Sequence, residues 1–193
     1  MAPLELFFDL VFVFAITQIA ALLRADHTLA GFGRGALILA MVYWGWSLFT
    51  WGLNATGTQR LFIRLGLLAA MATILLMAVV IPDAFGSRGE YFAAAYFGYR
   101  MIGTGMYYLA AGPEQRATLT SFVPTATVAA LVALAGGFAG DDLRPWIWLG
   151  SLVIDFGATR AAERADWHIQ PAHFAERYGL LVIVALGETV IAI

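Results

Sequence analysis

The chain contains no cysteine and no lysine, and each absence excludes a class of chemistry. Without cysteine, the chain has neither disulfides nor thiolate-ligated metal sites. Without lysine, it lacks the amine that forms a Schiff base with retinal or pyridoxal phosphate, and also the lysine of a P-loop. An apolar chain of this kind is therefore not a retinal-binding rhodopsin.

Charge is also scarce. Only 12% of the 193 residues are charged, roughly half of the value of about 25% that is usual in soluble domains. Hydrophobic residues make up 61% of the chain, and the mean hydropathy is +0.79. This composition predicts a polytopic membrane protein. The net charge of −2 says little here, because the location of charge matters more than its sum.

The hydrophobic residues are gathered into runs that approach the roughly 20 residues a spanning helix needs. We predict an all-α transmembrane bundle of six spanning helices plus a seventh that is cut short, with only 18 residues from Glu176 onwards. No linker interrupts the chain, so residues 1–193 are expected to form one transmembrane domain. The last apolar run ends at Ile193 without a polar cap, which favours the N-terminal part of a longer membrane protein. The predicted helices are 4–23, 35–53, 61–81, 91–111, 118–138, 145–163 and 174–193.

Arginine placement gives the expected orientation. Six arginines fall on the N-terminal side of the predicted bundle and four on the opposite side, which favours a cytoplasmic N-terminus under the positive-inside rule. The two groups are Arg60, Arg64, Arg116, Arg160, Arg164 and Arg177, against Arg24, Arg34, Arg88 and Arg144.

Several charges lie inside the apolar runs. They are Glu5, Asp9, Arg100, Asp155 and Glu188. A charge at bilayer depth costs about 2.5–3.5 kcal/mol on insertion scales, so such residues normally face a bundle interior, pair with each other and mark a pathway or site. We therefore treat these five as a candidate intramembrane charge network.

Helical spacing places some of these residues on shared faces. Glu5 and Asp9 are four residues apart, and Asp155 shares a face with Ser151 and Thr159. Arg100 lies on a face with Tyr96, Gly103, Thr104 and Tyr107. Asp155 is the best candidate partner for Arg100. The spacing leaves two interpretations open: a lock between helices, and an anchor for an anion or substrate.

A dense polar segment precedes the seventh predicted helix. Two histidines in it, His168 and His173, are five residues apart in a segment with a proline, and no zinc-binding His-Glu-x-x-His pattern is present. We expect no metal and no cofactor. The other charged residues of this segment are Glu163, Arg164, Asp166, Glu176 and Arg177.

Two stretches of the sequence resemble the signatures of a known family. LELFFDLVFVFAITQ at 4–18 and HFAERYGLLVIVALGETVIAI at 173–193 are similar to those of the bacterial low temperature requirement A (LtrA) family. The resemblance covers the whole chain, which corresponds to about the N-terminal half of a typical member. It implies a multi-pass bacterial plasma-membrane protein linked by name to growth in the cold. By this resemblance, the positions that match the family signatures are Glu5, Asp9, Thr17 and Gln18 in the first stretch. In the second stretch they are the helix-entry positions His173, Glu176 and Arg177, with Gly187 and Glu188.

Three functions remain open from the sequence. The first is a proton- or ion-linked transporter or channel-like protein that uses the intramembrane carboxylates. The second is a membrane-embedded enzyme acting on a lipid or isoprenoid carrier, with His173 and its neighbours at the membrane face. The third is a non-catalytic cold-adaptation scaffold. The expected partners are the lipid bilayer and a proton or small ion, with a homo-oligomer left open and no nucleic acid.

Overall fold

The computed structural model describes residues 3–56, 60–162, 178–180, 182–183 and 185–187. Within these residues every regular element is helical, as the composition predicts. Residues 178–180, 182–183 and 185–187 are helical too, and they are all that the structure describes of the seventh predicted helix. The labelled elements are α1 (Pro3–Ala25), α2 (Leu29–Thr56), α3 (Leu61–Val80), the short 3₁₀ helix η1 (Ile81–Asp83), α4 (Gly89–Ala110), α5 (Pro113–Gly137) and α6 (Arg144–Ala162).

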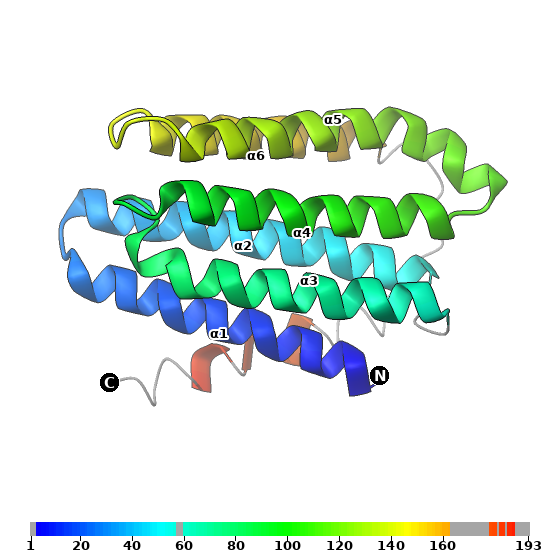
Figure 1. Cartoon of the computed structure of the whole chain (residues 1–193), viewed down its shortest axis with the longest axis horizontal. Helices are drawn as coiled ribbons and strands as arrows, with labels where there is room; N and C mark the ends of the chain where they lie inside the picture. The colour runs from blue at the N-terminus through cyan, green and yellow to red at the C-terminus, as the bar shows by residue number, and fades with distance from the viewer. Residues whose placement is uncertain (1–2, 57–59, 163–177, 181, 184, 188–193) are drawn as a thin grey trace.

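The helices are packed in an up-and-down bundle (Figure 1). In this view α5 and α6 form one side, α2 and α4 the middle, and α1 and α3 the other side. The closest packing joins α3 to α4, α5 to α6, and α4 to α5. Successive helices run in opposite directions, so the C-terminal ends of α2, α4 and α6 lie at the same end of the bundle as the N-terminus.

The distribution of apolar side chains suits a lipid environment. Large hydrophobic residues are exposed along the outer faces of α1 and α3, whereas several charged and polar groups are buried inside. This is the pattern expected when lipid replaces water around a helical bundle. Examples of the exposed side chains are Leu6, Phe7, Leu10, Leu65, Leu68 and Leu76.

Three of the described helices are long and apolar enough to cross a membrane: Leu4–Ala25, Leu29–Leu53 and Leu61–Asp83. The helices α4, α5 and α6 have 22, 25 and 19 residues but are less apolar. Their extra glycine, tyrosine, threonine and charged residues explain the difference. Some of these polar residues take part in the buried contacts described below.

The bounds of the first six predicted helices agree with the structure to within a few residues, with two larger differences, and most of the seventh lies outside the described residues. Helix α2 begins at Leu29 rather than at 35, because Thr28 caps it: its hydroxyl accepts a hydrogen bond from the Gly31 backbone N–H at 3.0 Å. The Asp26 carboxylate accepts hydrogen bonds from the Thr28 side chain and backbone, which lower the pKa of Asp26. Helix α5 begins at Pro113 rather than at 118, since proline is well tolerated in a first helical turn.

Candidate functional site

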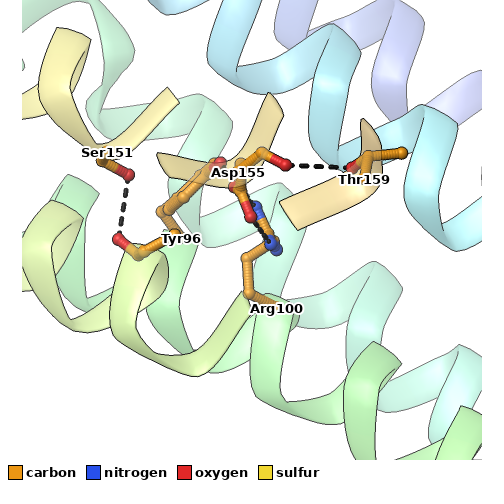
Figure 2. Close-up of polar contacts among 6 residues, drawn as sticks. Tyr96, Arg100, Ser151, Asp155 and Thr159 are labelled. Atoms are coloured by element: carbon orange, nitrogen blue, oxygen red, sulfur yellow. Dashed lines mark hydrogen bonds and ion pairs between the residues drawn. The ribbon is translucent and has the colours of Figure 1, made fainter. Parts of the chain in front are cut away.

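A buried ion pair joins the middle of α4 to the middle of α6. The Arg100 guanidinium donates through Nη1 to Asp155 Oδ2 at 2.5 Å and through Nη2 to Asp155 Oδ1 at 2.9 Å (Figure 2). The two side chains are only 3% and 1% exposed. This bidentate geometry is the strongest form of an arginine–carboxylate pair. The helix spacing identified the correct partner for Arg100.

Neighbouring side chains form hydrogen bonds around the pair. Arg100 Nη1 also donates to the Tyr96 hydroxyl at 3.0 Å, and the Thr159 hydroxyl donates to the Asp155 backbone carbonyl at 2.9 Å (Figure 2). One turn away on α6, Ser151 donates to the Ala129 carbonyl of α5 at 2.9 Å. Helices α4, α5 and α6 are thus fixed to one another by polar contacts at mid-bundle. Removing one member of such a buried pair typically costs about 3–5 kcal/mol.

A cavity leads to this ion pair. Arg100 lines it at one end, and the space is formed between α2, α4, α5 and α6. About 70 Å³ is available to the centres of water-sized molecules, enough for several waters. Its other lining residues are Gly45, Leu48, Phe49, Trp51, Gly52, Leu53, Tyr99, Gly103, Thr104, Met106, Tyr107, Phe122, Val123 and Thr159.

One buried hydroxyl on the cavity wall has no hydrogen-bond partner among the described residues. This is the Oη of Tyr99, which lies against Gly45 of α2. A Cβ atom added at Gly45 would overlap this oxygen, so glycine is needed where the Tyr99 ring approaches α2. Sequence reasoning missed Tyr99, because it lies beside the predicted Arg100 face rather than on it.

A second polar centre joins α1 and α2. Asp9 and Glu5 are both buried, at 6% and 8% exposure, and Asp9 accepts a hydrogen bond from the Trp46 indole N–H at 2.8 Å. Trp46 packs against the Tyr178 ring, whose hydroxyl donates to Ser47 at 2.9 Å. The predicted membrane carboxylates in the described residues are therefore buried, but Asp9 and Asp155 contact different helices.

Two expectations about other residues need correction. Tryptophan in a membrane protein usually lies near helix ends as an interfacial anchor, but Trp46 and Trp148 are fully buried. Their indole N–H groups donate to Asp9 and to the Ala133 carbonyl, which satisfies them in the core. Arg144 was counted as a loop arginine. It is 6% exposed and donates to backbone carbonyls of two neighbouring loops.

The remaining predicted site residues lie outside the described part of the chain. They are Glu188 of the charge network and the helix-entry positions His173, Glu176 and Arg177, together with the neighbouring Glu163, Arg164, Asp166 and His168. Among the residues that the structure describes, no group of three or more histidine or acidic side chains is arranged to hold a metal ion.

Comparison with known proteins identifies the family. A protein of Rhizobium meliloti (strain 1021), named "Uncharacterized protein RA0937", is 33% identical over 202 residues. The match covers 98% of this chain and 49% of that protein, so the chain spans about half the length of this curated relative. No solved structure matches the chain. The family model described as bacterial low temperature requirement A protein (LtrA) matches residues 1–193. The chain belongs to this family.

Proposed function

We propose that this chain forms part of a proton- or ion-linked transporter or channel-like protein of the bacterial cell membrane. The observation that carries the proposal is the Arg100–Asp155 pair, buried midway along two helices at the inner end of a cavity. Ionisable groups in such positions usually belong to a substrate or proton pathway. The apolar helices and the family membership support the membrane location.

The topology we propose has six spanning helices plus a seventh, in one transmembrane domain with a cytoplasmic N-terminus. The cavity-lining parts of α2 and α4, Gly45–Leu53 and Tyr99–Tyr107, belong to the C-terminal halves of these helices. Those halves point to the end of the bundle where the N-terminus lies (Figure 1). With this orientation, the cavity extends from the cytoplasmic side towards the middle of the membrane.

The two charged residues then have different roles. Arg100 stays protonated in proteins and acts as a fixed positive charge. In the proposed cycle Asp155 carries the proton only in the state in which its pair with Arg100 has opened, because a carboxylate buried without its cation becomes neutral. Asp9 and Glu188 are further membrane carboxylates on the proposed pathway. Glu5, one turn before Asp9, is buried beside it on α1.

The test is a flux measurement on the purified full-length protein in liposomes that contain a pH-sensitive dye, under an imposed potential. We expect a proton or ion flux that Asp155→Asn and Asp9→Asn abolish while the proteins still insert and fold. Ser151→Ala is the matched control on α6, since it removes one hydrogen bond to α5 and leaves the ion pair in place. Full flux in both acid variants would refute the role of these carboxylates.

A non-catalytic scaffold is the second candidate, and a specific observation favours it. The Arg100–Asp155 pair is bidentate and well supported, as expected for a lock between α4 and α6. A charge swap, Arg100→Asp with Asp155→Arg, separates the two functions. A scaffold predicts that the swap restores stability and with it whatever the single variants lose. Transport predicts that stability returns but flux does not, because the fixed cation has moved to the other helix.

A further inference from the structure

The cavity carries a single kind of charge on its wall. Among the described residues that line it, Arg100 is the charged one, and the others are apolar, aromatic, glycine or threonine. Asp155 neutralises this guanidinium while the pair is closed, so Arg100 attracts an anion only when the pair opens, and no carboxylate among the described lining residues attracts a cation. The aromatic side chains Phe49, Trp51, Tyr107 and Phe122 offer a surface for an apolar body. The cavity therefore fits an organic anion better than a small inorganic cation.

An anion reaching Arg100 meets a guanidinium that already has a partner. Nη1 donates to Asp155 and Tyr96, and Nη2 donates to Asp155. A second carboxylate cannot take the bidentate position while Asp155 holds it. Binding therefore requires Asp155 to leave, and a buried carboxylate that has lost its cation takes up a proton.

We infer that Arg100 exchanges Asp155 for the carboxylate of a monocarboxylate with an apolar or aromatic body, and that Asp155 takes up one proton in the exchange. The inference rests on the proposed transport function and names its substrate class. The balance is simple: one carboxylate and one proton enter, the guanidinium changes partner, and Asp155 becomes a neutral carboxylic acid. No covalent bond is made or broken apart from the O–H bond on Asp155.

The surroundings of Asp155 allow this exchange. Among the described residues, the titratable groups near it are Arg100, Tyr96 and Tyr99, all from α4. The cavity-lining parts of α2 and α5, Gly45–Leu53 and Phe122–Val123, contribute neither an acid nor a base. On α6 the neighbours are Ser151 and Thr159, whose hydroxyls donate to backbone carbonyls. Among the described groups, Asp155 is therefore the acceptor for a proton taken up in this region on binding.

Tyr99 supplies a second contact for the anion. Tyr99 lines the cavity, and its hydroxyl, which is buried against Gly45, has no partner among the described residues. Tyr99 is also adjacent to Arg100 in the chain. A carboxylate oxygen that accepts from the Tyr99 hydroxyl would satisfy a donor that the described protein groups leave unused, and buried donors are normally satisfied.

The experiment measures binding and proton uptake together. Full-length protein in detergent is titrated with phenylacetate by calorimetry, and proton uptake is followed with a pH indicator in weak buffer. We expect uptake of one proton per phenylacetate bound, and binding that weakens about tenfold per pH unit between pH 6 and 8, as one-proton linkage requires. Benzyl alcohol and benzylamine, the neutral and cationic analogues, should bind far more weakly. Decanoate is titrated in parallel to distinguish two sources of the carboxylate. Tighter binding of phenylacetate than of decanoate would indicate a free aromatic acid, and the reverse would indicate a membrane fatty acid.

Variants identify the group that takes up the proton. Asp155→Asn should bind phenylacetate with no proton uptake and no pH dependence, whereas Arg100→Gln should lose binding at least tenfold. If Asp155→Asn keeps the one-proton uptake, the ligand itself carries the proton and the inference is wrong. The double variant Arg100→Gln with Asp155→Asn replaces both charges by neutral polar groups, which guards against misfolding of the single variants. It should fold and lose phenylacetate binding.

Two failures are distinguishable. If phenylacetate and decanoate do not bind wild-type protein but the liposomes still show a flux that depends on Asp155, the substrate class is wrong and the proposed transport stands. If no proton or ion flux is seen under any condition, transport itself is refuted. Binding of phenylacetate without proton uptake would overturn the exchange at Arg100.

Discussion

A guanidinium in the middle of a membrane helix needs acceptors in fixed positions, and Asp155 supplies two of them to Arg100. The sequence predicted this partner, because both residues lie mid-helix and each belongs to a polar helical face. The second centre could not be predicted in the same way. The donor to Asp9 is the indole of Trp46, 37 residues further along the chain, and tryptophan in a membrane protein is first interpreted as an interfacial anchor.

Replacing this tryptophan tests the Asp9 centre. Trp46→Phe removes the donor to a buried carboxylate, and we expect a loss of about 1–3 kcal/mol in the free energy of unfolding. Trp44→Phe is the matched control on the same helix, because the Trp44 indole N–H has no hydrogen-bond partner among the described residues. Thermal unfolding in detergent measures both. Equal destabilisation by the two variants would mean that the loss of stability comes from lost ring contacts and not from the hydrogen bond to Asp9.

At the scale of elements, Arg144 joins segments that are distant in the sequence. It lies at the start of α6 and donates to the Ala84 and Gly86 carbonyls after α3, and to the Ala139 carbonyl after α5. The sequence suggested only a loop arginine beside Asp141, with which it also forms an ion pair at 3.2 Å. The buried position depends on how two loops meet, which local sequence does not specify.

A conservative substitution tests this junction. Arg144→Lys keeps the charge but loses the planar fork of donors, so we expect a destabilisation of about 1.5–3 kcal/mol, the range for hydrogen bonds to charged groups. Arg88→Lys is the control, since Arg88 is exposed at the N-terminus of α4 and its side chain makes no cap hydrogen bond. A lower melting temperature for the first variant only is the expected result. Unchanged stability of Arg144→Lys would contradict the structural role.

The tight connection between α1 and α2 offers a second test at this scale. A Cβ atom at Gly31 would clash with the backbone oxygen and side chain of Asp26, whereas a Cβ at Gly33 would meet nothing within 4 Å. Gly31→Ala should therefore destabilise the protein. Gly33→Ala should be neutral or stabilising by up to about 1 kcal/mol, because alanine favours a helix over glycine. Thermal unfolding of the pair measures the difference, and a stabilised Gly31→Ala would contradict the close approach.

For the whole molecule, the sequence predicted the class of fold and most helix bounds because each apolar run is long and ends at clear turn residues. It did not predict how the helices pack. The cavity forms because α2 faces α4 and α6 across the bundle, where Trp44 contacts Phe156 at 4.0 Å between ring centroids. Such contacts between distant segments depend on tertiary packing. The cavity, and the Tyr99 hydroxyl that has no partner among the described residues, therefore emerge only from the structure.

The central claim is that water reaches the Arg100–Asp155 pair from one face of the membrane through this cavity. This chain contains no cysteine, so a single cysteine introduced into it is the only one within residues 1–193 and reports the accessibility of its own position. Thr104→Cys lies on the cavity wall. Leu65→Cys is the control: it is 57% exposed on the outer face of α3, beside Gly66, which approaches Met106 of α4.

The measurement is the rate of modification by a membrane-impermeant thiol reagent, added to either side of sealed vesicles. We predict that Thr104→Cys reacts from the side that carries the N-terminus and is protected by phenylacetate, while Leu65→Cys, facing lipid, reacts slowly from both sides. Equal and slow modification of both cysteines would contradict a water-accessible path to the ion pair.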